Sequence, residues 1–402
     1  MIPNGILVAV DFETAVPKDG QMVGSTEFYL PEFAVTSCAF AWRDGSEYRH
    51  IYAPSTEATR DVLTQLSAAG NPLIAHNLQF EYGVAMCKFP DLTLNWSADS
   101  MRMCQLWDNG GKKWVDAPLS LDELYAQAES GEQDKVVRNP MHGLSLSACI
   151  KRILGPEHDH KARAYEVLRS IGVPAGKEKT SLHMLPPAAM EAYNVGDAVA
   201  SLRLYEYVAA EFRREKYDWA LDWSIFKFMM DRMVRSRIVG IRVDLAKVAE
   251  GIATVNAEIE AIRTSFKDAM SEPIRRVEAR RLQEVLDSYK TEMGRSKYLN
   301  SGKHVEECAF NPASTKQLAM LFVDELGMSP QFVTKKGAPS FASSHLSQWG
   351  EGGKMLERLK KRGIVLSQLI SLQELAARDG RWHVDIKVCG TSTGRMAGGS
   401  HE

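Results

Sequence analysis

The sequence lacks the features that mark several classes of protein. Its six cysteines include no C-x-x-C pair, so their spacing indicates neither a disulfide framework nor a structural zinc site. No apolar run approaches the length of a membrane span, and the N-terminus lacks the basic-then-apolar pattern of a signal peptide. We therefore expect a cytoplasmic protein with reduced, buried thiols and no membrane partner.

An excess of charge of either sign is also missing. The chain has 49 Lys and Arg residues and 51 Asp and Glu residues, for a net charge of −2. Global charge would not draw such a molecule to nucleic acid, so any such binding must rely on local basic patches. The 45% hydrophobic and 25% charged residues are typical of a soluble globular protein, and 402 residues predict two or three domains.

Residues 7–14, LVAVDFET, predict an apolar strand that carries Asp11 and Glu13 at its end. Side chains alternate between the two faces of a strand, so both carboxylates project from the same side. Two like charges brought to one place need a compensating positive charge, and a divalent metal ion is the simplest one. The alternative of two solvated residues at a strand end stays open here, because D-x-E is a short and common pattern.

Strand and helix patterns alternate from this strand to about residue 215, which predicts an α/β domain. Asp44-Gly45 marks a hairpin turn between two apolar strands, and Gly70 ends the helix that follows them. The predicted elements are strands at 35–42, 48–53 and 72–76 and helices at 56–69, 146–154 and 185–212.

Serines mark helix starts in the middle of this region. Ser120 and Glu123 form a capping-box pattern, and Ser145 precedes an apolar helical segment. Residues 127–140, between them, are polar and predict a surface loop.

A short polar segment contains His158 and His160 on either side of Asp159. His and Asp are both common metal ligands, but no further ligand follows at a typical spacing. A solvated loop is therefore favoured over a metal site.

The helix predicted at 185–212 carries Tyr193 and Asp197 one turn apart on the same face. Taken alone, Tyr193 would be a core aromatic residue and Asp197 an exposed helix residue. However, this pair is the third acidic segment in a defined order along the chain, and that order argues against a purely structural role for Tyr193 and Asp197.

Three short motifs in order resemble the exonuclease motifs of the DnaQ-like (DEDD) superfamily. Each motif is weak alone, but three in order over about 210 residues are a specific pattern, and the Y-x-x-x-D form of the third is similar to the tyrosine subclass. Glu81 departs from the pattern, since the family usually has Asp there. The matching stretches are Asp11-Phe12-Glu13, His76-Asn77-x-x-Phe80-Glu81 and Tyr193-x-x-x-Asp197.

The resemblance implies an RNase H-like α/β domain with a mixed sheet flanked by helices, which hydrolyses DNA from the 3′ end with two Mg²⁺ or Mn²⁺ ions. Phosphodiester hydrolysis by a pair of ions needs hard oxygen ligands. It implies that Asp11, Glu13 and Asp197 bind the metal, that Glu81 acts through bound water and that Tyr193 holds the attacking water. The second motif implies that His76, Asn77 and Phe80 contact DNA.

Beyond residue 215 the sequence becomes helix-rich and periodic, and it resembles the thumb region of family A DNA polymerases. The similar stretches are the GIRVD turn at 240–244, a long helix from 245 to 266 and NPASTKQL at 311–318. Ser314 and Gln317 also form a capping box, which predicts a helix start on local grounds. The resemblance implies DNA contacts by Lys316, and the basic runs 275–281 and 354–362 could bind phosphates without reading sequence.

Near the C-terminus, Arg381-Trp382-His383 and the stretch 390–395, GTSTGR, resemble the segment where family A polymerases enter the palm and grip the primer-template duplex. Thr391 and Arg395 are the DNA-binding residues that this implies. The predicted domains are an exonuclease domain at 1–214, a helical thumb region at 215–378 and a truncated palm at 379–402. No polymerase activity is expected from this chain alone.

The sequence therefore predicts the exonuclease and thumb portion of a phage-type family A DNA polymerase, located in the host cytoplasm if phage-encoded. Its own activity would be metal-dependent 3′-5′ proofreading hydrolysis during DNA replication, with a single-stranded 3′ end and primer-template duplex as partners. A separate polypeptide would carry the palm and fingers if the polymerase is split. The alternatives are a free-standing nuclease acting on RNA or single-stranded DNA, a non-catalytic DNA-gripping subunit, and an unrelated α/β hydrolase with a helical appendage.

Overall fold

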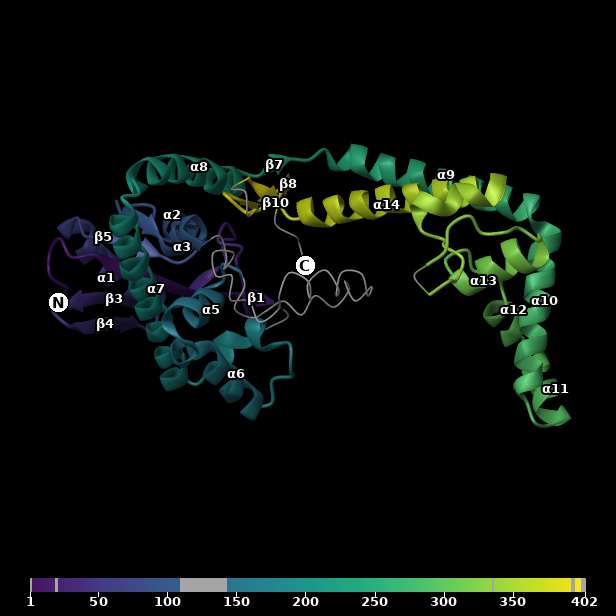
Figure 1. The fold of residues 1–402 in the computed structure, drawn as a ribbon, viewed down its shortest axis with the longest axis horizontal. Coiled ribbons are helices and arrows are strands. Elements are labelled where there is room, and N and C mark those ends of the chain that lie inside the picture. The colour runs from purple at the N-terminus through teal and green to yellow at the C-terminus, as the bar shows by residue number, and fades with distance from the viewer. Residues whose placement is uncertain (1, 19–20, 109–142, 335, 392–394, 399–402) are drawn as a thin grey trace. The chain divides into compact units, whose positions relative to one another are not determined.

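The computed structural model describes residues 2–18, 21–108, 143–334, 336–391 and 395–398 (Figure 1). The chain forms two compact units, and each is considered by itself. The first unit comprises residues 1–241 and 383–402, and the second comprises residues 242–382. None of the described helices is long and apolar enough to cross a membrane.

This division differs from the predicted domains at both borders. Residues 215–241 and 383–391 pack with the first unit, whereas the sequence pattern places them in a thumb and a palm. The exonuclease, thumb and palm identities of these segments stay predictions.

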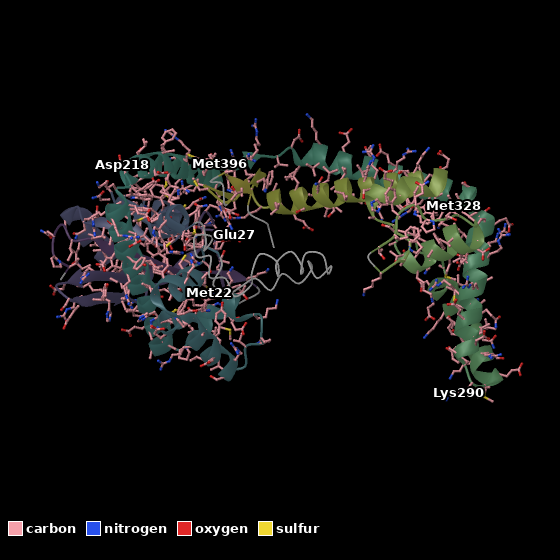
Figure 2. All side chains as sticks on the ribbon, viewed as in Figure 1. Met22, Glu27, Asp218, Lys290, Met328 and Met396 are labelled. Carbon is pink, nitrogen blue, oxygen red and sulfur yellow. The ribbon has the colours of Figure 1, made fainter. Side chains whose placement is uncertain are left out.

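A mixed sheet forms the centre of the first unit (Figure 1). Its order is β4-β3-β1-β5-β6, in which β4, β3 and β1 are antiparallel and β5 and β6 run parallel to β1. A short strand, β2, pairs with the end of β1 and carries Met22, which is labelled in Figure 2. The strands are β1 (Val8–Lys18), β2 (Gln21–Gly24), β3 (Ala34–Asp44), β4 (Glu47–Ala53), β5 (Pro72–Ala75) and β6 (Asn95–Asp99).

Alternate residues of β1 face two different hydrophobic clusters, as expected for a central strand buried on both faces. Val8, Val10 and Phe12 pack with residues of α1 (Thr56–Ala69), α2 (Leu78–Lys88) and α8 (Trp219–Val239). Ala9 packs on the other face with residues of α3 (Ser100–Asp108), α5 (Leu146–Cys149) and α7 (Pro187–Glu215). Asp11 and Glu13 have the parity of Ala9, so the strand directs both toward the face that α7 covers.

Helix ends in the first unit follow the local sequence signals. Helix α1 begins after Ser55, whose side chain accepts a hydrogen bond from the Ala58 amide, and it ends at Gly70 with φ 65°. Ser145 caps α5 as predicted, and the chain continues through a π-helical turn to Leu154. The predicted capping box at 120–123 and the loop at 127–140 lie outside the described residues.

The segment containing Asp159 is not the solvated loop that the sequence predicts. Asp159 is buried and caps α6 (His160–Ser170) by accepting a hydrogen bond from the Lys161 amide at 3.2 Å. It also accepts a hydrogen bond from the Ser147 hydroxyl at 2.6 Å and pairs with Lys151 at 2.9 Å. Side chains from α5 and the π-helical turn that follows it help to bury this carboxylate, and the polar residues directly beside Asp159 do not reveal these contacts.

The second unit is helical and built on two long helices that lie side by side, α9 (Leu245–Ala269) and α14 (Gly350–Ala376) (Figure 1). They run antiparallel, since Gly251 faces Leu369 while Glu258 pairs with Arg362 at 2.9 Å. A buried cluster that includes Phe322 and Trp349 joins them to α10 (Ser271–Ser288) and α13 (Thr315–Ala319). The unit also contains α11 (Glu292–Asn300) and α12 (Lys303–Glu307), and Lys290, labelled in Figure 2, lies between α10 and α11.

Candidate active site

Strand β1 delivers the first two acidic residues. Asp11 and Glu13 are partly buried, and Phe12 between them is buried and stacks on Phe89 with ring centroids 6.3 Å apart. The register of β1 against β3 shifts between Glu13 and Thr14. Such bulges re-aim side chains at the edge of a site, and here the irregularity follows Glu13 directly.

Helix α7 crosses this face of the sheet and carries Tyr193 and Asp197, both buried with 8% exposure. Burial, and then the charge of Asp197, raises the pKa of the Tyr193 hydroxyl well above its usual value, so the two side chains lie near each other. Their spacing of four residues places them on the same helical face, as the sequence predicts.

Asn194, the neighbour of Tyr193, fixes the first carboxylate. Its side-chain amide donates to an Asp11 carboxylate oxygen at 2.6 Å and to the Asp11 carbonyl at 3.0 Å. The Asn194 side-chain oxygen accepts a hydrogen bond from the Ser37 hydroxyl at 3.1 Å. The fully buried Asn194 therefore joins β1, β3 and α7 at the position of Asp11.

The fourth carboxylate, Glu81, lies in the first turn of α2 and is 4% exposed. Asp99 organises the start of this helix, because its carboxylate accepts hydrogen bonds from the amides of Asn77 at 3.1 Å and Leu78 at 3.0 Å. Asn77 adopts the left-handed conformation with φ 66°, which asparagine tolerates better than most residues. The turn between β5 and α2 thus places Glu81 beside the other acids.

The four carboxyl groups are near enough to raise one another's pKa. Burial, and then the charge of Glu13, raises the pKa of Asp11 well above its usual value. Burial and the charge of Asp197 raise the pKa of Glu13 to about 8. For both Glu81 and Asp197, burial is the largest cause of a strongly raised pKa and the charge of Asp11 is the second.

These acids have the donor chemistry of a site for hard divalent cations. Carboxylate oxygens are the preferred ligands of Mg²⁺ and Mn²⁺, and one buried Glu81 oxygen has no hydrogen-bond partner. A bound cation would remove the mutual repulsion that raises the pKa values. Within the described residues, however, no three His, Cys, Asp or Glu side chains are grouped closely enough to hold one ion.

The residues of the second motif have different surroundings. His76 is buried, and its ring nitrogens lie 2.9 Å from the Ser100 hydroxyl and 2.9 Å from the Leu144 carbonyl. Burial is the largest influence on its pKa, which falls to about 4. Asn77 is exposed and Phe80 is half-buried against Phe28. The geometry therefore favours Asn77 and Phe80 over His76 for contact with a ligand.

The DNA-binding residues predicted from the C-terminal half lie elsewhere. Lys316 is 77% exposed in the second unit and pairs with Glu284 at 3.3 Å. In the first unit, the exposed Arg395 donates its backbone amide to the Thr391 hydroxyl at 2.9 Å. None of these three residues belongs to the carboxylate cluster.

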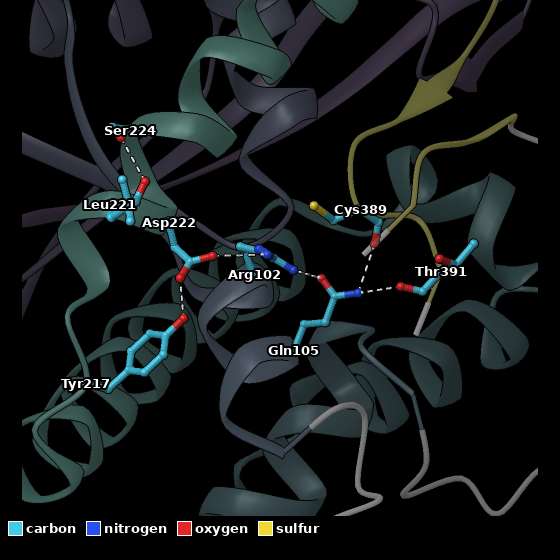
Figure 3. Close-up of polar contacts among 8 residues, drawn as sticks. All are labelled: Arg102, Gln105, Tyr217, Leu221, Asp222, Ser224, Cys389 and Thr391. Carbon is cyan, nitrogen blue, oxygen red and sulfur yellow. Dashed lines mark hydrogen bonds and ion pairs between the residues drawn. The ribbon is translucent and has the colours of Figure 1, made fainter. Parts of the chain in front are cut away.

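Residues 383–391 are held on the first unit by two glutamine side chains. Gln105 donates to the carbonyls of Cys389 at 2.9 Å and Thr391 at 2.8 Å, and Arg102 links it to Asp222 (Figure 3). Gln79, in the same helix as Glu81, donates to the Ile386 carbonyl and accepts from the Val388 amide. This short segment therefore bonds directly to the helix that carries Glu81.

Sequence reasoning missed Asn194, Asp99 and Lys161, which act on the cluster from its surroundings. The positive charge of Lys161 partly offsets the rise in the pKa values of both Glu13 and Asp197. Asn194 could have been noticed as a polar residue beside Tyr193 on a helix face expected to be buried. Asp99 and Lys161 carry no local signal, since their partners lie far away in the sequence.

The sequence matches no protein-family model and no curated protein. Its structure is similar to a solved structure described as the POL domain of Pol1 from M. smegmatis in complex with DNA primer-template and dNTP. The TM-score is 0.56 at 16% sequence identity, and the match covers 96% of this chain.

The chain has a family A polymerase-like fold. It spans about half the length of the M. smegmatis protein, since the match covers 51% of that chain. The mixed α/β part and the helix-rich part both fall within the matched region. A family A polymerase-like fold over nearly the whole chain agrees with the resemblance found in the sequence.

Proposed function

We propose that the first unit is a metal-dependent 3′-5′ exonuclease domain of the RNase H-like, DnaQ-like type, and that it proofreads DNA within a family A polymerase of phage type. The observation that best supports this is the gathering of four carboxyl groups from three distant segments. Asp11, Glu13, Glu81 and Asp197 influence one another's pKa, and the charge of Asp197 also raises the pKa of Tyr193.

In this proposal the protein's own residues orient the site. Asn194 holds Asp11 in one rotamer, and Asp99 organises the helix start that places Glu81. Asp11, Glu13 and Asp197 would hold two Mg²⁺ or Mn²⁺ ions, with Glu81 acting through water. When bound, such ions supply an activated hydroxide and stabilise charge on the leaving oxygen.

The second unit is proposed to hold primer-template DNA. A cavity of 570 Å³ lies between α9 and α14, and one wall carries Arg358, Lys361 and Arg362. Arg362 pairs with Glu258 and Lys361 with Glu357, whereas Arg358 forms no ion pair within the described residues. These cations could bind phosphates without reading sequence, as expected for an enzyme that must accept any primer.

One observation favours a second candidate, a DNA-gripping subunit without hydrolytic activity. The carboxylates are near one another, but no three of them are grouped closely enough for one ion in the described part of the chain. If the carboxylates stay too far apart to bind a metal ion even when the ion is present, the protein would bind DNA without cleaving it.

A nuclease assay tests the proposal. The purified chain with Mg²⁺ should shorten a 5′-labelled single strand of DNA from its 3′ end, and Asp11→Ala and Asp197→Ala should reduce the cleavage to background. Asp91→Ala is the matched control, because it removes a carboxylate that is 61% exposed and paired with Arg60.

A wild-type chain as inactive as the Asp11 and Asp197 variants, yet able to bind DNA, would instead identify the gripping subunit. Faster cleavage of RNA than of DNA would favour a free-standing nuclease.

A further inference from the structure

Helix α6 carries two cations near the candidate site that have no acidic partners among the described residues: Lys161 near the carboxylates, and Arg163 in a cavity lined by Tyr193. Lys161 and Arg163 lie in its first turn, and neither forms an ion pair with any of the described residues. Arg169 at the other end of α6 contrasts with them, since it pairs with Glu178 at 3.1 Å. Unpaired cations beside a group of carboxylates are available to an anionic ligand.

The start of α6 is held firmly in place. Asp159 caps the helix through the Lys161 amide and is itself fixed by Ser147 and Lys151. Gly196, directly before Asp197 in α7, allows a close approach of the two helices, since a Cβ there would lie 2.4 Å from the His160 ring. The local packing therefore presses the first turn of α6 against the part of α7 that carries Asp197.

The two cations lie near different tyrosine rings. The Lys161 ammonium lies 5.5 Å from the centroid of the Tyr165 ring. Arg163 lines a cavity of 270 Å³ whose walls include Tyr193 and three alanines of α7, Ala188, Ala189 and Ala192. The small alanine side chains leave the space open, and Tyr193 lies both in the wall of this cavity and near Asp197 of the acid cluster.

We propose that Lys161 and Arg163 form a phosphate clamp that holds the backbone of a single DNA strand beside the carboxylate cluster. The clamp deepens the proposed exonuclease function and rests on it. Lys and Arg side chains bind phosphodiesters by charge and hydrogen bonds without regard to base sequence, which suits a site that must accept any 3′ end. The positive charges of Lys161 and Arg163 would also offset the repulsion that the carboxylates exert on the incoming strand.

Binding measured without cleavage tests the clamp separately from the chemistry. The probe is a six-nucleotide oligo-dT with a 5′ fluorescein, followed by anisotropy in EDTA at several salt concentrations. Lys161→Gln and Arg163→Gln should each weaken binding about tenfold. Each should also reduce the slope of log affinity against log salt by about 0.7, the value for one phosphate contact on a single strand.

Two further variants control for charge and for folding. Lys161→Arg should restore most of the binding, because it keeps the positive charge. Arg49→Gln removes an equal charge from the edge strand β4, where Arg49 pairs with Glu47, and should leave the affinity unchanged. With Mg²⁺ present, Lys161→Gln should raise KM for the oligonucleotide far more than it lowers kcat.

The outcomes separate the clamp from the proposed hydrolysis. Wild-type cleavage together with unchanged binding by Lys161→Gln and Arg163→Gln would overturn the clamp and leave the exonuclease intact. Weakened binding by these variants without wild-type cleavage would support the clamp and refute the exonuclease. A third outcome would also overturn the clamp. If Lys161→Gln and Arg163→Gln lose binding to free deoxynucleoside monophosphate but bind the DNA strand as wild type does, the two cations hold the released product and not the strand.

Discussion

Stability of the metal-free protein should fall as pH rises, which is unusual for a protein with many carboxylates. Glu13 shows why, because its pKa is raised from 4.5 to about 8 by burial and by Asp197. A carboxyl with a raised pKa in the folded state stabilises the fold below its unfolded pKa and loses that contribution as pH rises through the folded pKa. Between about pH 4.5 and pH 8, this single group should lower the free energy of unfolding.

The magnitude follows from proton linkage. Each pH unit in that window costs up to about 1.4 kcal/mol for one carboxyl, and partial exposure of Glu13 to solvent reduces the effect. The raised pKa values of Asp11, Glu81 and Asp197 act in the same direction. The pKa of His76, lowered from 6.5 to about 4, acts in the opposite direction and offsets part of the fall over that range. Mg²⁺ should reverse the trend, because a bound cation stabilises the ionised carboxylates.

Native-state hydrogen exchange of the β1 amides is the suitable assay, since it reports on the first unit without interference from the second. The opening free energies of the wild type in EDTA should decrease from pH 5 to pH 8. Those of Glu13→Gln should decrease less over the same range, because glutamine does not titrate. Asp91→Ala, which removes an exposed carboxylate, should follow the wild type. Equal slopes for wild type and Glu13→Gln, or stability that rises with pH in EDTA, would refute the proposed electrostatic coupling.

Three further predictions concern packing and positioning. Asn194→Ala removes two donors from Asp11 and should destabilise the first unit by about 2–3 kcal/mol; unfolding midpoints unchanged from wild type would contradict this. Gly353→Ala should destabilise the second unit by about 1–3 kcal/mol or more, since the new Cβ would lie 2.0 Å from the Leu346 carbonyl oxygen. Gly363→Ala in the same helix has nothing within 4 Å and should stabilise it by about 0.5–1 kcal/mol, so thermal midpoints that shift in the same direction for both would argue against the packing. Gln79→Ala should speed hydrogen exchange at the Val388 amide by roughly tenfold or more, and an unchanged rate would mean that other contacts hold residues 383–391.

Much of the first unit could be read from the sequence, because its signals are local. Helix α1 has the predicted bounds and ends at Gly70, and the hairpin turns at Asp44-Gly45 as predicted. The alternation of side chains on β1 correctly places Asp11 and Glu13 on one face. Capping and strand alternation depend on neighbours within a few residues, so a sequence pattern contains all the information they need.

The surroundings of the site depend on contacts between distant segments. Asn194 reaches Asp11 across 183 positions, and His76 is buried by residues that follow it by 24 and 68 positions. Asp159, expected in a solvated loop, becomes a buried cap through Ser147 and Lys151. No local pattern contains these partners.

The sequence by itself determined which acidic and aromatic residues share one face of β1 and which lie in α2 and α7, because periodicity and spacing are properties of the chain. The prediction that Asp11 and Glu13 lie at the end of the strand was wrong, since β1 continues to Lys18 through its pairing with β2 and β3. Only the tertiary structure decided which of these residues lie close together and how strongly their charges repel one another. Burial and mutual repulsion raise the pKa values of the four carboxyls, and both effects arise when the sheet and α7 pack together. Lys161 next to those acids is likewise a product of packing, made by the close approach of α6 to α7 at Gly196.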